Sequence, residues 1–102
     1  MEGRASISPD VLARYAADAA REVAGVRELV ESHLHRHRGV RVVDANGGSG
    51  VSVEIHVAVE WGMSVPEVGR ALQRRVGDYL ERMAGARPQA VNVVVDEIGP
   101  PA

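Results

Sequence analysis

The pattern of hydrophobic and polar positions is most regular between Val51 and Gly62. Along this stretch, six apolar positions alternate with five others, and the apolar ones are Val51, Val53, Ile55, Val57, Val59 and Trp61. Such alternation is typical of a strand with one buried face and one wet face. Eleven residues at about 3.3 Å each span about 36 Å, more than most strands. We therefore expect a central strand that pairs with different neighbours along its length, with Trp61 in the core.

Two segments show the three- and four-residue spacing of amphipathic helices. The first begins at Ser8, a good N-cap, followed by Pro9 in the first turn. Its apolar stripe is rich in alanine, which allows close packing against a sheet. The second begins with the capping box Ser64-Val65-Pro66-Glu67 and continues for about five turns to Gly85. Its apolar positions are Val65, Val68, Leu72, Val76, Tyr79, Leu80 and Met83.

Three other segments have the composition of strands. Val40–Asp44 and Ala90–Ile98 are rich in valine, and the glycine-rich residues 45–50 predict a hairpin into the long strand. The stretch Val26–Arg38 is ambiguous, because Val26–Val30 suits either a short strand or the start of a helix. A strand, a helix and a strand after residue 50 predict a crossover between parallel strands.

Composition limits the binding partners and the cellular location that we expect for the protein. The formal net charge of −2 does not favour nucleic acid or an anionic membrane. Cysteine is absent, which removes disulfides and thiolate metal sites and fits a reducing cytoplasm. No apolar run approaches the roughly 20 residues of a membrane span, and the N-terminal segment lacks the apolar region of a signal peptide. We expect a cytoplasmic protein with no direct membrane span and no cofactor.

A histidine- and arginine-rich stretch contains the candidate metal ligands. His33, His35 and His37 share one side of a strand, and His33 and His37 share one side of a helix. Either arrangement can present imidazoles to Zn²⁺ or Ni²⁺. Arg36 and Arg38 oppose a bound cation, so a solvated connector is the favoured interpretation.

The same stretch forms a local basic patch. Arg36, Arg38 and Arg41 can bind lipid phosphates or an acidic partner, more strongly below pH ~6.5, where the histidines become charged. An ordinary wet loop is again the favoured interpretation.

The polar face of the long strand holds Glu54, His56 and Glu60 at a spacing that lets neighbours interact. A histidine between carboxylates is compatible with acid–base chemistry. The sequence supplies no nucleophile or closed pocket beside it, so a solvated face or a polar interface is favoured. Asp96 and Glu97 are expected to point to opposite faces of the last strand and to make a poor carboxylate pair.

Short motifs occur in a fixed order along the second half of the chain. They are Glu60-Trp61-Gly62, Val65-Pro66-Glu67-Val68, Gln73 with Val76, Met83-Ala84-Gly85 and Val91-Asn92-Val93-Val94-Val95. Together with Glu22-Val23-Ala24-Gly25-Val26, this set resembles the alkaline shock protein family of Gram-positive envelope-stress proteins. The resemblance spans about residues 8–98. Trp61 and Ala84 replace the family's usual tyrosine and threonine, which indicates a divergent member of actinobacterial type.

The resemblance implies a fold and a way of working. A strand usually follows the family's Gly-Val, so Val26–Val30 is expected to be a strand. The predicted fold class is then α+β: a two-layer sandwich with two helices and a small mixed sheet of three to four strands, in the order α-β-β-β-α-β. Residues 1–102 are expected to form a single domain of the alkaline shock type, with flexible ends at 1–6 and 99–102.

Three hypotheses about function follow. The main one, implied by the family, is a non-enzymatic cytoplasmic module that supports envelope homeostasis under stress. It would form homo-oligomers and dock on a small membrane-anchored protein or a family paralogue, without binding nucleic acid. The alternatives are a small RNA-binding α+β module, which the charge disfavours, and a small enzyme. The expected interaction residues are Glu54, His56, Glu60, Asn92, Arg36, Arg38 and Arg41.

Overall fold

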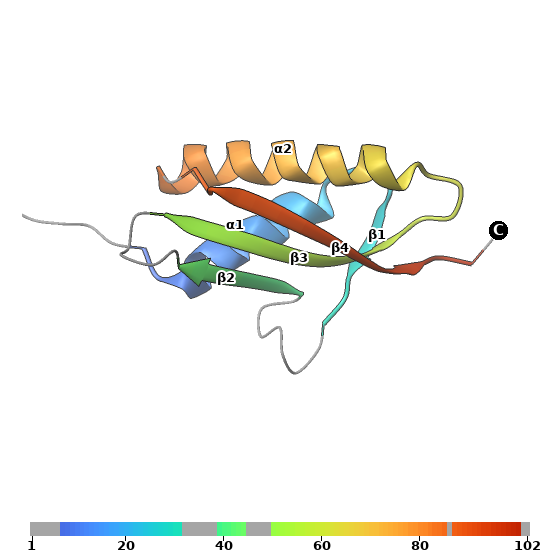
Figure 1. Ribbon diagram of the computed structural model, residues 1–102, viewed down its shortest axis with the longest axis horizontal. Coiled ribbons are helices and arrows are strands. Elements are labelled where there is room, and N and C mark those ends of the chain that lie inside the picture. Colours follow the sequence, from blue (N-terminus) through green and yellow to red (C-terminus); the bar gives the residue numbers. More distant parts are fainter. Residues whose placement is uncertain (1–6, 32–38, 45–49, 86, 101–102) are drawn as a thin grey trace, which may run out of the picture.

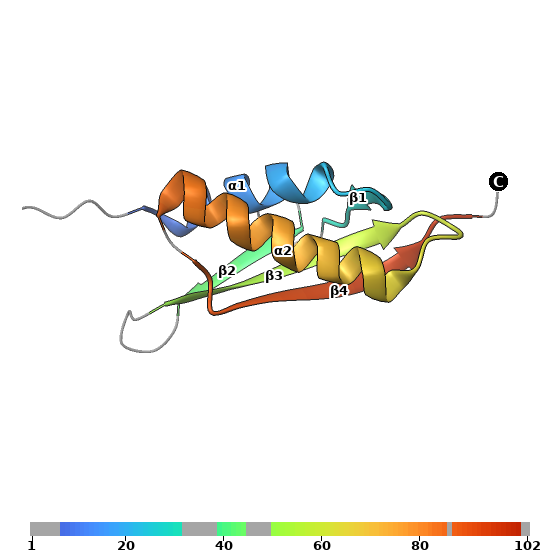
Figure 2. The same cartoon turned by 90° about the horizontal axis from the view of Figure 1, so that it is seen from above.

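The computed structural model describes residues 7–31, 39–44, 50–85 and 87–100. Its elements are α1 (Pro9–Arg21), β1 (Val26–Leu29), β2 (Val40–Asp44), β3 (Val51–Val59), α2 (Val65–Ala84) and β4 (Ala90–Ile98). In the described residues, the strands form one four-stranded sheet, and both helices cover the same face of it (Figures 1 and 2). The predicted two-layer α+β fold and the order of its elements are confirmed, including the strand after Gly25.

Both helices begin at the predicted caps. The hydroxyl of Ser8 accepts a hydrogen bond of 3.3 Å from the amide of Val11, and the hydroxyl of Ser64 accepts one of 3.3 Å from Glu67. Both amides lie in the first turn, where the usual helical acceptor is missing. The amide of Val11 also donates to the backbone carbonyl of Ser8 at 3.1 Å. At the other end of α2, Gly85 adopts a φ of 67°, a left-handed conformation that suits glycine.

The long strand β3 is the centre of the sheet. Along one edge it pairs antiparallel with β2 through residues 51–55 and with β1 through residues 57–59. Along the other edge it pairs parallel with β4 through residues 52–59. The strands β2 and β1 therefore follow one another along the same edge of β3 (Figure 1). The prediction that one long strand serves several neighbours is confirmed, and the sheet is mixed.

The core lies between the inner face of the sheet and the two helices. From β3 it receives Val53, Ile55, Val57 and Val59, all fully buried. The helices supply further buried residues, which include Leu12, Ala16, Ala20, Leu72, Val76 and Leu80. Burial of each large aliphatic side chain contributes about 1.5–3 kcal/mol, so this layer contact dominates the stability of the fold.

The sequence prediction for Trp61 is wrong. The strand ends at Val59, and the chain then turns through Gly62, whose φ is 89°. The amide of Met63 donates to the carbonyl of Glu60 at 3.2 Å, so Trp61 lies within this turn. The indole therefore leaves the inner face of the sheet and is 61% exposed. The alternating pattern in the sequence therefore continues two residues beyond the end of the observed strand.

Two of the three neighbours of β3, namely β1 and β4, contain an irregularity next to the residue that pairs with Ala58. In β1 the register passes from Val26 to Glu28, and in β4 it passes from Val95 to Glu97. The residues skipped are Arg27 and Asp96. An extra residue of this kind forms a β-bulge, which bends the strand and re-aims a side chain. The bulge in β4 breaks the strict alternation that was predicted for Asp96 and Glu97.

Candidate functional site

The face of the sheet opposite the helices carries the polar side chains. By strand register this outer face comprises Glu28, Arg41, Val43, Ser52, Glu54, His56, Ala58, Ala90, Asn92, Val94 and Glu97, joined by Asp96 at the bulge. Neither α1 nor α2 lies over this face, as Figure 2 shows. Within the described residues, the outer face is therefore open to a second molecule.

Three of these residues form a connected group, named here the His56 cluster: Glu54, His56 and Asp96. The Nδ1 of His56 lies 2.7 Å from Oδ2 of Asp96, and its Nε2 lies 3.2 Å from Oε2 of Glu54. The imidazole is only 14% exposed, whereas the two carboxylates are about one-third exposed. The cluster thus joins β3 to β4 through a largely buried imidazole.

The geometry indicates which protonation state the cluster holds. An ionised carboxylate only accepts hydrogen bonds, so an imidazole between two carboxylates donates from both nitrogens and is the imidazolium ion. Burial lowers the pKa of His56. The hydrogen bonds to Asp96 and Glu54 and the attraction of both charges outweigh it, so the pKa is raised above 6.5.

The sequence predicted half of this arrangement. It placed His56 between the carboxylates of Glu54 and Glu60, and the contact with Glu54 is present. Glu60 lies beyond the end of β3, where its backbone amide donates to the carbonyl of Gly25. The second carboxylate belongs to Asp96, for which the alternating pattern predicted no contact with His56. Only the parallel register of β4, together with its bulge, would have identified it.

The other predicted interaction residues surround the cluster or lie outside the described residues. Arg41 on β2 and Asn92 on β4 flank Glu54 in the strand register, and both are exposed. Outside the described residues lie His33, His35, His37, Arg36 and Arg38.

The possible metal site stays a prediction. In the described part of the chain, no group of three or more His, Cys, Asp or Glu residues could hold a metal ion. The His56 cluster fits this finding, since both of its ring nitrogens already face carboxylates. Calorimetric titration with Zn²⁺ at pH 7.5 tests the remaining candidates at His33, His35 and His37, and an absence of heat would exclude them.

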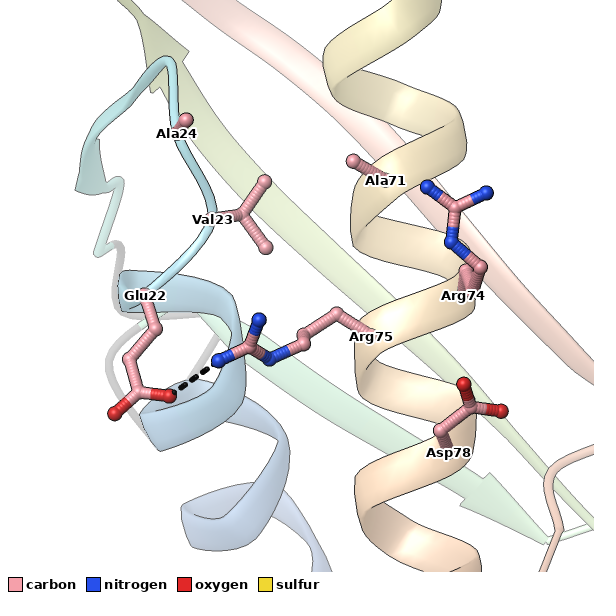
Figure 3. A pocket seen from close by; sticks show the side chains of 7 residues that line it. All are labelled: Glu22, Val23, Ala24, Ala71, Arg74, Arg75 and Asp78. Carbon is pink, nitrogen blue, oxygen red and sulfur yellow. Dashed lines mark hydrogen bonds and ion pairs between the residues drawn. The ribbon is translucent and has the colours of Figure 1, made fainter.

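A groove on the helical side is the other concave feature of interest. It encloses about 340 Å³ between the end of α1 and the middle of α2. Figure 3 shows Arg75 reaching from α2 to Glu22, where the two charged groups lie 2.9 Å apart. Arg74 and Asp78 add one more charge of each sign to the lining. Because the charges balance and the ion pair is largely exposed, the groove shows no preference for a charged ligand.

Exposed apolar side chains gather at the end of the sheet where β3 and β4 finish. Val59 and Ile98 are paired at this end, and the turn that follows β3 carries Trp61 and Met63. The exposed fractions are 54% for Ile98, 61% for Trp61 and 41% for Met63. Tryptophan is prominent among the residues that dominate binding energy at protein interfaces. This end of the sheet is therefore a second candidate contact surface.

These features define a small two-layer α+β domain with one open, polar sheet face. A family model described by its cell envelope-related function matches residues 1–100. The chain belongs to this family, the alkaline shock protein family, as the sequence motifs predicted.

Two bacterial relatives support the assignment. An uncharacterized protein of Streptococcus pyogenes serotype M6 is 28% identical over 107 residues, which cover 95% of this chain and 88% of the relative. The uncharacterized protein YqhY of Bacillus subtilis is 28% identical over 101 residues, which cover 89% of this chain and 73% of YqhY.

Solved structures share the fold. A variant of the MamM CTD has a TM-score of 0.63 at 19% identity, covering 85% of this chain and 80% of that chain. The zinc form of another MamM CTD variant has a TM-score of 0.61 at 18% identity, covering 89% and 86%. In the residues described for the present chain, no helix has both the length and the apolar character needed to cross a membrane.

Proposed function

We propose that the chain is a non-enzymatic, cytoplasmic interaction module of the cell envelope. It associates with further copies of itself and docks on a small membrane-anchored partner or a family paralogue. The cell envelope-related function of the family supports the setting of this proposal. The sheet face that no helix covers supports the proposed association and docking.

The open outer face is the observation that carries the proposal. The helices of this two-layer domain cover only one side of the sheet. In the described residues, β4 pairs with β3 along one of its edges, and its other edge has no partner strand. Unpaired strand edges and partly apolar sheet faces favour contact with another chain. On the outer face, Val43 is 43% exposed, and the same face carries the exposed polar side chains of Arg41 and Asn92. Such a mixture of apolar and polar surface is typical of protein interfaces.

The same face gives little support to catalysis or RNA binding. Both nitrogens of His56 are occupied by carboxylates, so the ring offers no vacant acceptor for a substrate proton. Glu54 and Asp96 repel phosphate groups, and none of the residues assigned to the outer face is Phe, Tyr or Trp. An interface between proteins fits these side chains better.

Self-association is tested by light scattering on the full chain across a wide concentration range. The proposal expects a mass at the upper concentrations that is a multiple of 10.9 kDa. A strict monomer at high concentration would contradict self-association.

Docking is tested separately by a photo-crosslinking amino acid at residue 43 or residue 11 in cells. Both native residues are valines of similar exposure, but Val43 lies on the outer face and Val11 on α1. The proposal expects a membrane-protein adduct from position 43 and none from position 11. Equal adducts from both positions, or none from either, would contradict docking through the outer face.

A further inference from the structure

We infer that the His56 cluster is a pH-sensitive latch, in which the protonated imidazole ties β4 to β3 and its deprotonation loosens the C-terminal half of β4. The latch itself rests on the geometry of the cluster. Its effect on association rests on the proposed function, because β4 contributes to the outer face.

The two hydrogen bonds of the cluster depend on the second proton of the His56 ring. Asp96 lies 2.7 Å from Nδ1 and Glu54 lies 3.2 Å from Nε2, so both bonds require a hydrogen on the ring nitrogen. A neutral imidazole has a single N–H and leaves one carboxylate facing a lone pair. Loss of the proton therefore converts an attractive bridge between two strands into a partly repulsive one.

The surrounding charges also favour the imidazolium ion. Strand register or direct contact places five described charged residues on the same face as His56. They are Glu54 on β3, Asp96 and Glu97 on β4, Glu28 on β1 and Arg41 on β2. Four are carboxylates and one is a guanidinium group. The helices lie on the opposite face of the sheet (Figure 2).

The two halves of β4 are held in different ways. At its start, the amide of Gln89 donates to the carbonyl of Val51 at 2.8 Å, and the Gln73 side chain donates from α2 to the carbonyl of Val91 at 3.2 Å. Towards its end, the bulge at Asp96 interrupts the regular register. The pairing resumes at Glu97 and Ile98, and the amide of Gly99 donates to the carbonyl of Val59 at 2.7 Å. The link from Asp96 to His56 lies at this interruption, so its loss acts mainly on the second half of the strand.

The direction of the pH dependence follows from the raised pKa of His56. Below the unfolded pKa of about 6.5, both folded and unfolded chains carry the proton, and the latch contributes in full. As the pH rises, the unfolded chain loses its proton first, so stability falls until the pH has passed the folded pKa. Each unit between the two pKa values corresponds to about a tenfold change in the unfolding constant.

The first experiment is an NMR titration of the histidine ring signals in the wild type, His56→Gln and Asp96→Asn. The signal that disappears in His56→Gln belongs to His56. The latch requires that the pH midpoint of this signal is higher than the midpoint of histidine in an unfolded reference peptide. It also requires that Asp96→Asn lowers the midpoint of His56. Titration at the reference value, or a midpoint unchanged by Asp96→Asn, would overturn the latch.

The second experiment measures amide exchange along β4 at pH 6 and pH 9, corrected for intrinsic rates. The wild type is expected to lose several-fold more protection at residues 94–98 than at residues 90–92 as the pH rises. His56→Gln is the matched control, because it keeps the other three of the four histidines. It is expected to show no such difference between pH values. Uniform loss along β4, or the same loss in His56→Gln, would contradict the inference.

Light scattering at pH 6 and pH 9 separates the latch from the proposed function. Weaker association of the wild type at pH 9, absent in His56→Gln, supports the coupling. A monomer at both pH values contradicts the proposed self-association but leaves the titration and exchange results standing. Association that is equal at both pH values overturns the coupling alone.

Discussion

The inner and outer faces of β3 differ in what surrounds their side chains. On the inner face, Val53 and Ile55 are enclosed by helices and neighbouring strands without any polar group. On the outer face, Glu54 and His56 are partly exposed and bonded to each other. Because successive residues point to opposite faces, one short segment can serve stability and recognition separately. Substitutions one position apart should therefore have very different effects.

The largest expected effect is on the inner face. Ile55→Ala removes a fully buried side chain and should lower the free energy of unfolding by about 2–5 kcal/mol, through lost burial and a cavity. Urea denaturation followed by circular dichroism measures this loss. Ser52→Ala, on the outer face of the same strand, is the control and should change stability by less than about 0.5 kcal/mol. Similar losses in the two variants would contradict the assignment of the faces.

The second prediction compares two glycines with positive φ. Gly25 has a φ of 93°, and a Cβ there would lie 2.7 Å from Cγ2 of Val68, whereas Gly62 has a φ of 89° with nothing within 4 Å. Gly62→Ala should cost about 1–2 kcal/mol from backbone strain alone. Gly25→Ala should cost at least about 1 kcal/mol more, because the helical layer must also move. Equal thermal unfolding midpoints for the two variants would show that the space around Gly25 does not matter.

The sequence predicted the elements better than their contacts. The alternation around Ile55 and the cap at Ser64 are local signals, and both elements formed as expected. Trp61 was misplaced because a pattern of apolar residues does not show where a strand turns away from its sheet. Asp96 was missed because a bulge and a parallel register are properties of two strands together, which are separated here by α2.

The third prediction concerns the exposed end of the sheet. Trp61→Ala should change the free energy of unfolding by no more than about 1 kcal/mol, because most of the indole is already in water. Quenching of the fluorescence of this single tryptophan by acrylamide should be strong in dilute protein. Protection from acrylamide at high protein concentration would place Trp61 in the interface, whereas weak quenching in dilute protein would contradict the exposed position.

The smallest expected effect is on the helical side. Arg75→Ala removes an exposed ion pair with Glu22 and should change stability by no more than about 0.5 kcal/mol. Chemical denaturation at low and high salt checks this value. A loss as large as that of Ile55→Ala would mean that the groove between the helices is an important part of the core.

The central claim, that the outer face mediates association, is tested most directly by sedimentation velocity on Val43→Glu and Val11→Glu. Both variants place a new carboxylate at a valine about 40% exposed, on the outer face and on α1 respectively. We expect Val43→Glu to sediment as a monomer at concentrations where the wild type and Val11→Glu are associated. Association of Val43→Glu equal to that of the wild type, or its loss in Val11→Glu instead, would contradict the claim.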